Sequence, residues 1–522
     1  MSKKRNKSSK KSSSAHFPLV NVPCGSYDVV IVGGGASGLA SAIAYMQSYI
    51  RQTSHASASH LAPHPRVAIV EAGKRIGTSI MRSGNGRCNF SNASLDLSRY
   101  YHASFVKQAF SALEENAEVP SVLAWFEQLG LVWEEMPGSG GLLYPFSKKA
   151  NSVLDVLRKA LDAYGVEICE MSLVETVRTD SKKAFLVSGK THKNAEEWVP
   201  FTIEANSVVL ASGGITPQDI LSEKHLAYRN PRPLLGPLQA VPLVPISLKS
   251  LDGIRIQAKV MLEGLAYREE GVRREPDTLT SRSQTFTLRE SGAQGSGCRF
   301  EEKGEVLFRD YGLSGIVIFN ASRYAQPGDV LLLDLMPSFD EDKLRKILHE
   351  RFTLQKESPA YSFFVGFVVN PLAEALLKTA GIASDAVLKE SDIEKLVHVC
   401  KAFPFRIEGI ADERTCQVHR GGVQPEEVDP HTMEVYSCPG LFITGEALDV
   451  DGPCGGYNLH WAWTTGLLSG NALAHRGVKS SLSDGAFAHR GVENPLSGNV
   501  FTRRDAKNLL SDNTLVHRDA KN

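Results

Sequence analysis

The sequence lacks the features that mark several classes of protein. It has no excess of either charge, because 58 basic residues match 58 acidic ones among 522 residues, so the whole chain exerts no broad attraction on nucleic acid or an anionic membrane. Its eight cysteines form no CxxC pair and no Cys/His spacing typical of a metal site, and we expect reduced thiols and no bound metal. No apolar segment follows the basic start as in a secretion signal, so we expect a cytoplasmic protein that does not span a membrane.

The two ends of the chain have compositions that cannot form a core. The first eleven residues carry six cations and no apolar residue after Met1, so residues 1–26 are predicted to be a disordered arm that either aids solubility or binds RNA. Near the other end the segments AHRGV and RDAKN each occur twice in polar surroundings. Residues 474–522 are therefore predicted to form a flexible, repetitive tail.

Between these ends the pattern predicts an α/β protein of several parts. Alternating strand and helix patterns predict a Rossmann-like domain made of residues 27–239 and 403–473. Short strand-like pieces over residues 240–335 predict an inserted β-rich domain with a long charged loop from Glu269 to Gly304. Residues 336–402 are helical in pattern and predict a small helical subdomain.

A glycine turn follows the first predicted strand, YDVVIVG, and opens the first predicted helix. In the order Gly33, Gly35 and Gly38, the glycines allow a tight turn, close approach of a diphosphate, and close packing of helix on sheet. Glu71 ends the next predicted strand, where a carboxylate accepts hydrogen bonds from ribose hydroxyls. Its distance from the turn exceeds the usual interval of about 20 residues, and a polar insertion at residues 51–65 accounts for the excess. These residues predict dinucleotide binding, with FAD or NAD favoured over NADP.

Two further motifs distinguish between these dinucleotides. They are GTSIMRSGNGRCNFSN (Gly77–Asn92) and GLFITGEALDVDGPCGGYNLHWAWTTGLLSG (Gly440–Gly470). With the glycine turn they resemble the BaiN-like flavoproteins, a family also described as aminoacetone oxidase-like FAD-binding enzymes. The segments GLLYPFSKKANSVLDVL, GEVLFRDYGLSG and QVHRGGVQPEEVDPHTMEV extend the resemblance over most of Tyr27–Ala474. The resemblance implies an oxidoreductase with tightly but non-covalently bound FAD.

The motifs predict which residues contact the cofactor. Gly445 and Glu446 end an apolar strand, and Asp449 and Asp451 can bond to ribityl hydroxyls. The helix that opens directly afterwards can stabilise negative charge on a reduced flavin through its free N–H groups and dipole. The predicted cofactor residues are Gly33, Gly35, Ser37, Gly38, Glu71, Ala72, Gly84, Arg87, Cys88, Asn89, Gly445, Glu446, Asp449, Asp451, Gly455, Gly456, Tyr457 and Asn458.

Four residues are candidate catalytic groups, although the pattern identifies no catalytic acid. Arg87 can hold an oxygen of the flavin or the substrate. Cys88 can be a redox thiol, but it has no CxxC partner, which favours a packing role. Tyr457 and His460 belong to the start of the last helix, and a single histidine more often satisfies hydrogen bonds than transfers protons.

The resemblance implies three reactions. They are reduction of an electron-poor C=C bond in a steroid-like enone, reduction of uridine in ribosomal RNA, and amine oxidation. We favour a reductase that acts on a small-molecule enone, because the FAD signature is matched and the start of the last predicted helix can stabilise an anionic reduced flavin. No second strand–GxGxxG–helix unit is present, so NAD(P)H is expected to act as a transient electron donor. The non-enzymatic alternative is an RNA-binding flavoprotein that uses the basic arm and cations such as Arg273 and Arg274. The chain departs from the family pattern at residues 215–233 and Arg309–Ile316, so contacts that the family makes through these segments are not carried over. The sequence predicts neither the substrate nor the oligomeric state.

Overall fold

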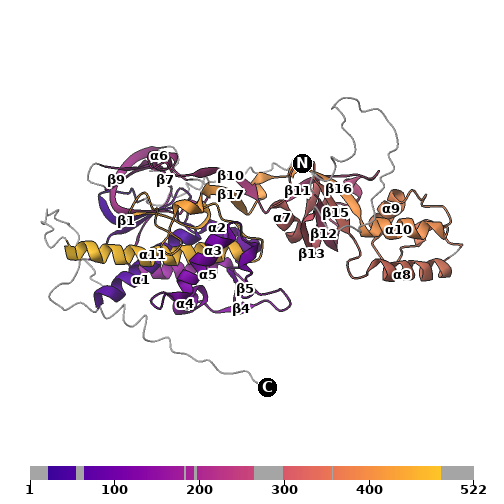
Figure 1. Ribbon diagram of the computed structural model, residues 1–522, viewed down its shortest axis with the longest axis horizontal. Helices are drawn as coiled ribbons and strands as arrows, with labels where there is room; N and C mark the ends of the chain where they lie inside the picture. Colours follow the sequence, from indigo (N-terminus) through magenta and orange to yellow (C-terminus); the bar gives the residue numbers. More distant parts are fainter. Residues whose placement is uncertain are drawn as a thin grey trace, which may run out of the picture. The chain divides into compact units, whose positions relative to one another are not determined.

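The computed structural model describes residues 21–54, 64–180, 184–192, 197–214, 216–263, 298–355 and 357–483. The chain divides into two compact units, drawn in Figure 1. The first unit comprises Met1–Pro231, Gly421–Asp451 and Gly455–Asn522, and the second comprises Arg232–Arg420 and Gly452–Cys454. The predictions for residues 1–20, for Arg273 and Arg274, and for the tail beyond residue 483 lie outside the described residues.

The first unit is built on a seven-stranded sheet in the order β6-β2-β1-β9-β8-β7, with β18 also paired to β9. The strands are β1 (Ser26–Val32), β2 (Val67–Val70), β6 (Glu167–Cys169), β7 (Ser172–Thr179), β8 (Phe185–His192), β9 (Trp198–Leu210) and β18 (Leu441–Ile443). The pairs of β1 with β2 and β9, of β2 with β6, and of β18 with β9 are parallel. All four residues of β2 are buried, as expected for a parallel strand covered on both faces.

Helices and a small second sheet complete the first unit. The helices are α1 (Ala36–Ser54), α2 (Thr78–Arg82), α3 (Ala103–Glu115), α4 (Val122–Gln128), α5 (Ala150–Ala163), α6 (Gln218–Glu223) and α11 (Tyr457–Ser483). The second sheet has the order β3-β5-β4, with β3 (Ser91–Asn92), β4 (Trp133–Glu135) and β5 (Leu142–Pro145). Helix α5 and strand β6 form one step of the alternating pattern predicted for residues 27–239.

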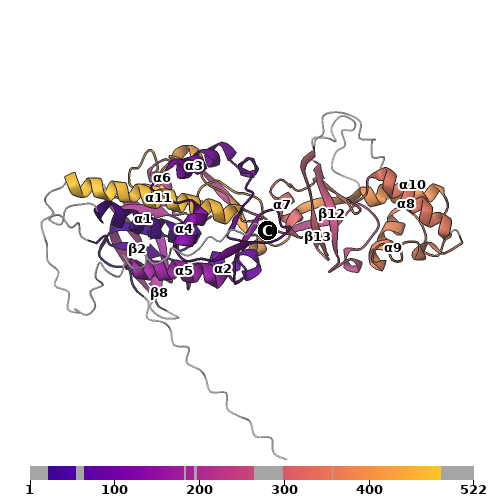
Figure 2. The ribbon, with the colours of Figure 1, turned by 90° about the horizontal axis from the view of Figure 1, so that it is seen from below.

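The helices α1 and α11 come from opposite ends of the chain and pack directly on each other, as Figures 1 and 2 show. A Cβ atom on Gly466 would lie 2.5 Å from the Ala40 Cβ, and one on Gly470 would lie 2.6 Å from the Ala44 Cβ. Both positions therefore exclude any side chain. Since Gly466 and Gly470 meet α1 in the same order along both helices, α1 and α11 run parallel.

The second unit contains a closed barrel with the strand order β11-β14-β13-β12-β15-β16. Its strands are β11 (Leu238–Pro242), β12 (Arg255–Glu263), β13 (Cys298–Arg309), β14 (Gly312–Ser314), β15 (Val330–Asp334) and β16 (Phe403–Ile410). Its helices are α7 (Ile316–Ser322), α8 (Glu341–Leu354), α9 (Asn370–Thr379) and α10 (Ser391–Lys401). Barrel and helices share one hydrophobic core, and the Lys401 ammonium at the end of α10 lies 2.5 Å from the Asp334 carboxylate at the end of β15. The chain passes between the units in β10 (Tyr228–Leu234) and β17 (Val418–Val423), which pair with each other.

The structure corrects several predicted boundaries. Residues 403–410 form β16 of the barrel instead of belonging to the Rossmann-like domain, because strand β16 pairs with β11 and β15. Residues 298–304 lie in β13 instead of the predicted loop, and α1 continues through residues 51–54 of the predicted insertion. Residues 474–483 continue α11 instead of beginning a flexible tail. Among the described residues, no helix is both long and apolar enough to cross a membrane.

The contact between α1 and α11 can be tested with Gly470→Ala. The added Cβ would lie 2.6 Å from the Ser41 carbonyl oxygen, so we expect the first unit to lose about 1–3 kcal/mol of unfolding free energy. Urea unfolding followed by tryptophan fluorescence measures this free energy, because all five tryptophans belong to the first unit.

The matched control is Gly477→Ala in the same helix. There the nearest atom to an added Cβ is the Tyr45 hydroxyl oxygen at 3.6 Å, an ordinary contact. Alanine favours helix over glycine by about 1 kcal/mol, so this variant should be as stable as the wild type or more stable. Equal stabilisation of both variants would contradict the close contact at Gly470.

Candidate functional site

The predicted glycine turn joins β1 to α1, and its three glycines have different surroundings. An added Cβ on Gly33, where φ is 107°, would lie 2.5 Å from the Ala211 carbonyl oxygen. On Gly38 it would lie 2.1 Å from the Gly33 carbonyl oxygen. On Gly35, by contrast, the nearest atom is the Ser79 hydroxyl oxygen at 3.6 Å. The outer two glycines therefore let the chain pack on itself, and Gly35 leaves open space at the start of α1.

Glu71 follows β2 and lies beside this turn. One carboxylate oxygen accepts a hydrogen bond from the Gly34 N–H at 2.7 Å, and the other accepts one from the Gly73 N–H at 2.6 Å. The side chain is only half-buried, and its neighbour Ala72 is exposed. Each oxygen keeps a further lone pair for a hydroxyl donor. Glu71, the residue predicted to bind the ribose, therefore lies beside the turn predicted to bind the diphosphate.

The segment that follows β18 lies beside the start of α1. A Cβ on Gly445, where φ is 60°, would lie 2.7 Å from the Ser37 hydroxyl oxygen at the start of α1. Gly445 is also held by α11, because its N–H donates to the Thr465 hydroxyl at 2.9 Å and its carbonyl accepts from the Trp461 indole at 3.1 Å. Glu446, the next residue, remains partly exposed.

The loop before β3 is held in unusual backbone conformations. Gly84, Asn85, Gly86 and Cys88 all have φ between 54° and 78°. The Arg87 side chain is exposed, whereas Cys88 is fully buried and burial raises the pKa of its thiol to about 12. A protonated, inaccessible thiol does not suit redox chemistry, which supports the packing role expected for Cys88.

Asn89 carries an unsatisfied polar atom. The residue is 9% exposed, and its Oδ1 atom has no hydrogen-bond partner among the described residues. A buried acceptor without a donor is unfavourable by about 1–3 kcal/mol. A ligand N–H group beside Asn89 would remove that penalty.

Ser91 and Asn92, which follow this loop, form hydrogen bonds at the start of α11. The Asn92 amide donates to the Gly455 carbonyl at 3.0 Å, and the Ser91 hydroxyl lies 2.7 Å from Nδ1 of His460. Gly456, with φ of 89°, approaches so closely that a Cβ there would lie 2.3 Å from the Ser91 carbonyl oxygen. Our sequence analysis missed Ser91 and Asn92 as site residues, although both belong to the RCNFSN motif.

Tyr457 and His460 are packed at the start of α11. The Tyr457 hydroxyl accepts the Asp96 N–H at 3.1 Å, and its carbonyl accepts the Tyr100 hydroxyl at 2.8 Å. The His460 ring stacks on Phe110 with ring centroids 5.2 Å apart, and burial lowers the pKa of His460 to about 4. His460 is therefore neutral at neutral pH, and its imidazolium is not available there as an acid.

Asp449 and Asp451 are both fully buried. The Asp449 carboxylate accepts the Gly421 N–H at 2.8 Å and the Gln424 amide at 3.0 Å, and lies 3.1 Å from an Arg229 nitrogen. Burial alone would raise the pKa of Asp449, but the hydrogen bond from His102, together with the groups just named, outweighs it and lowers the pKa. This geometry favours a structural role for Asp449 over the ribityl contact, which stays a prediction for both aspartates.

The described residues fit a long dinucleotide. Neither α1 nor α11 has an acidic residue in its first turn, so the N–H groups and dipole of each helix remain available to an anion or an electron-rich ring. Gly466 lies beside Ser37, and α11 begins nine residues earlier at Tyr457, which places its start about 14 Å beyond the start of α1 at 1.5 Å per residue. The open space at Gly35 lies at one end of this stretch, and the loop that carries Asn89 is bonded to the other end through Ser91 and His460.

The comparisons with known proteins agree with this geometry. The family model described as HI0933-like protein Rossmann domain matches residues 27–472. The chain belongs to the HI0933-like family. It is 30% identical to a 3-dehydro-bile acid delta(4,6)-reductase of Clostridium scindens over 455 residues, which is 85% of this chain and 98% of that protein.

Two further relatives of this HI0933-like protein are ribosomal RNA dihydrouridine synthases. The Haemophilus influenzae protein is 26% identical, with 76% of this chain and 90% of that protein covered. The Escherichia coli protein is 25% identical, with 84% of this chain and 96% of that protein covered. The BaiN-like resemblance and the Rossmann-type fold are thus confirmed, and the protein is a FAD-dependent oxidoreductase.

The position of Gly35 gives a test of cofactor binding. In Gly35→Ala the new Cβ meets no protein atom closer than 3.6 Å but fills the space at the start of α1, so we expect FAD to bind at least about tenfold more weakly. FAD titration of the apoprotein, followed by flavin fluorescence, measures the affinity. The unfolding free energy of the apoprotein should stay at the wild-type value, and an unchanged FAD affinity would contradict the predicted place of the diphosphate.

The partly buried His460 gives a test by pH. Its folded pKa of about 4 lies below the unfolded value of about 6.5, so the unfolded chain takes up a proton first as the pH falls. The stability associated with neutral His460 is complete above pH 6.5 and decreases towards pH 4. Between pH 7 and pH 5 the wild type should lose about 2 kcal/mol more unfolding free energy than His460→Gln.

Urea unfolding at both pH values measures this difference. The matched control is His64→Gln, which removes an exposed histidine of the first unit and should leave the wild-type pH dependence in place. If His460→Gln and the wild type lose the same stability, His460 is not buried in its neutral form.

Proposed function

We propose that this protein reduces a carbon–carbon double bond conjugated to a carbonyl group, with NAD(P)H as the electron source. The observation that carries the proposal is the 30% identity to a 3-dehydro-bile acid delta(4,6)-reductase over 98% of that protein's length. The reaction converts one enone, one NAD(P)H and one proton into a saturated carbonyl compound and NAD(P)⁺. When bound, FAD supplies the two-electron transfer between donor and acceptor.

The chain's own part is to bind, orient and stabilise charge. The free N–H groups at the start of α11 suit the electron-rich pyrimidine edge of a reduced flavin, because no acidic residue in the first turn opposes them. Asn89 offers its unpartnered amide oxygen to a ring N–H. The exposed guanidinium of Arg87 lies on the same loop and can hold a carbonyl oxygen of the flavin or the substrate.

The surroundings of the four candidate catalytic residues show which of them are unsuitable as the proton donor. Cys88 and His460 are unsuitable near neutral pH, the first because its thiol is buried and the second because its imidazole is neutral. Tyr457 is only 4% exposed, so its hydroxyl is not accessible to a substrate. The fourth candidate, Arg87, carries a guanidinium, which does not release a proton in proteins, so we assign no catalytic acid among the four candidates.

Reduction of uridine in ribosomal RNA is the second candidate function. It is favoured by the two relatives named as ribosomal RNA dihydrouridine synthases, at 26% and 25% identity. Uridine also presents a double bond conjugated to a carbonyl, so the same flavin chemistry applies. The higher identity and coverage of the bile acid reductase favour the small-molecule enone.

The acceptor experiment separates these functions. The flavin-loaded protein is reduced anaerobically with NADH or NADPH and mixed with a conjugated steroid enone, the matching saturated ketone, or ribosomal RNA transcribed without modifications. We expect flavin absorbance to return with the enone and not with the saturated ketone. Absorbance is recorded by stopped flow, and the product by mass spectrometry.

Three other results of the acceptor experiment would contradict the proposed reaction. Return of absorbance with RNA alone, together with a gain of two hydrogens in uridine, would replace the enone reductase by the dihydrouridine synthase. Rapid return with oxygen and release of peroxide would indicate an oxidase. A flavin that neither nicotinamide reduces would contradict the proposed electron source.

A further inference from the structure

Arg229, on β10 in the first unit, is held in place by a buried carboxylate. Its Nη1 atom donates to the Tyr101 hydroxyl oxygen at 2.7 Å and lies 3.1 Å from Oδ2 of Asp449. The Asp449 side chain is fully buried, whereas the Arg229 side chain is 50% exposed. The carboxylate therefore fixes the guanidinium from its buried side, and the exposed side of the guanidinium faces solvent.

The backbone brings this cluster together from distant parts of the chain. Gly421 on β17 donates its N–H to the Asp449 carboxylate at 2.8 Å, and its φ is 121°. A Cβ on Gly421 would lie 2.9 Å from the Arg229 carbonyl oxygen, so glycine is needed for this approach of β10. Tyr101 is fixed as well, because its N–H donates to the Asp451 carbonyl at 2.8 Å. A ligand of Arg229 would therefore bind to a preformed group, which removes part of the entropic penalty of binding.

Arg229 keeps most of its hydrogen-bonding capacity. Its hydrogen bond and its ion pair both involve Nη1, and neither Nε nor Nη2 has a partner among the described residues. These two nitrogens carry three N–H groups in a planar fork, which suits an oxygen that bears negative charge. Because Asp449 balances the charge of Arg229, the pair attracts such an oxygen mainly through these directed N–H groups.

The cluster lies beside residues predicted to contact the flavin. Tyr101 is bonded to Asp451, and its neighbour Tyr100 donates its hydroxyl to the Tyr457 carbonyl at 2.8 Å, at the start of α11. All these residues belong to the first unit. The segment of Tyr100 and Tyr101 therefore connects Arg229 with both glycine-rich parts of the predicted flavin site.

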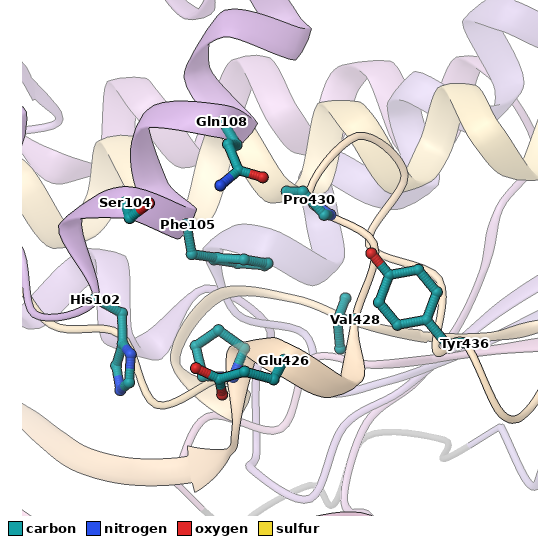
Figure 3. Close-up of a pocket in the computed structure, with 9 residues that line it drawn as sticks. His102, Ser104, Phe105, Gln108, Glu426, Val428, Pro430 and Tyr436 are labelled. Carbon is teal, nitrogen blue, oxygen red and sulfur yellow. The ribbon is translucent and has the colours of Figure 1, made fainter.

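A pocket of about 270 Å³ begins next to this cluster. Figure 3 shows it between α3 and residues 425–436, with His102 at one edge. The centroid of the His102 ring is 4.3 Å from that of the Tyr101 ring. Phe105 and Val428 line the pocket, so apolar surface for the hydrocarbon part of a substrate is present beside the cluster.

We propose that Arg229 binds the carbonyl oxygen of the substrate and stabilises the negative charge that this oxygen gains during reduction. In this step a hydride forms a bond to the β carbon, and the electron pair of the double bond moves towards the carbonyl oxygen to give an enolate. A proton from water then reaches the α carbon. Donors held in place before the reaction stabilise such charge most effectively. Asp449 and Tyr101 are positioning residues that act through Arg229, and the inference rests on the reaction proposed above.

The first test measures binding without turnover. Isothermal titration calorimetry compares the binding of two probes to the oxidised, flavin-loaded protein, at a pH at which the phenol is ionised. The probes are para-nitrophenolate, which like an enolate carries an anionic oxygen on an unsaturated carbon, and para-nitroanisole, its neutral methyl ether. We expect the wild type to bind nitrophenolate saturably, and Arg229→Lys to bind it at least about tenfold more weakly, because lysine keeps the charge beside Asp449 but lacks the fork. Nitroanisole should bind equally to both proteins. Equal affinity of both proteins for nitrophenolate, or no saturable binding to the wild type, would overturn the proposal.

The matched control is Arg178→Lys. Arg178 belongs to the same unit, is 66% exposed and lies 3.4 Å from the Asp219 carboxylate, so this variant should bind nitrophenolate as the wild type does. Tyr101→Phe is an independent variant that leaves the pair of Arg229 and Asp449 intact, and it should weaken nitrophenolate about two- to fivefold.

Cofactor affinity distinguishes the substrate oxygen from an oxygen of FAD. Titration of the apoprotein with FAD, followed by flavin fluorescence, should give the wild-type affinity for Arg229→Lys. Weakening of FAD by the same factor as nitrophenolate would assign Arg229 to the cofactor and overturn the proposal.

The second test separates this inference from the reaction on which it rests. In stopped flow, reduction of the flavin by nicotinamide and its reoxidation by ferricyanide should be equal in the wild type and Arg229→Lys, since neither involves a substrate carbonyl. Reoxidation by a steroid enone should be at least about 100-fold slower in Arg229→Lys. Equal rates with the enone would overturn this inference alone, whereas a wild type that reduces no enone would overturn the proposed function and the inference with it.

Discussion

The close packing of α11 on α1 is the constraint on which the cofactor site depends. It joins the first helix after β1 to the last helix of the described chain, with no side chain between them at Gly466 and Gly470. The Ser41 and Ser469 hydroxyls, 2.8 Å apart, satisfy each other inside this contact. Because the helices are parallel and offset, the start of α11 extends past the start of α1. One contact thus sets the separation between the dinucleotide turn and the second glycine-rich motif.

The loop before β3 completes the site because buried bonds to α11 hold it in place. Ser91 is bonded to His460 in the first turn of α11, and Asn92 is bonded to Gly455 just before this helix. The Phe90 carbonyl accepts the Trp463 indole N–H at 3.0 Å. The left-handed residues of the loop are tolerated since these bonds fix their position. The chain therefore contributes a rigid frame with oriented N–H groups and amide oxygens, while the redox chemistry belongs to the cofactor.

Many strands and helices could be predicted because short-range sequence patterns encode them. The strands and helices around Gly33 and Gly455 follow from apolar runs interrupted by glycines, and α5 and α8 follow from helical periodicity. The domain boundary at residue 403 was wrong for a physical reason. Strand β16 belongs to the barrel through pairing with β11, which lies more than 150 residues earlier in the chain, and no local pattern reports such a partner.

The sequence by itself determined the family, the fold class and the identity of the motifs, since glycines, a strand-end acid and short specific segments are local properties. The tertiary structure decided what each motif residue does. It separated Gly35, which faces open space, from Gly33 and Gly38, which touch backbone. It also showed Cys88 and Asp449 to be buried and His460 to be stacked on Phe110. It also brought Phe105 to Glu426 across more than 300 residues. Burial and partnership arise from residues distant in the chain, so only the folded structure could assign them.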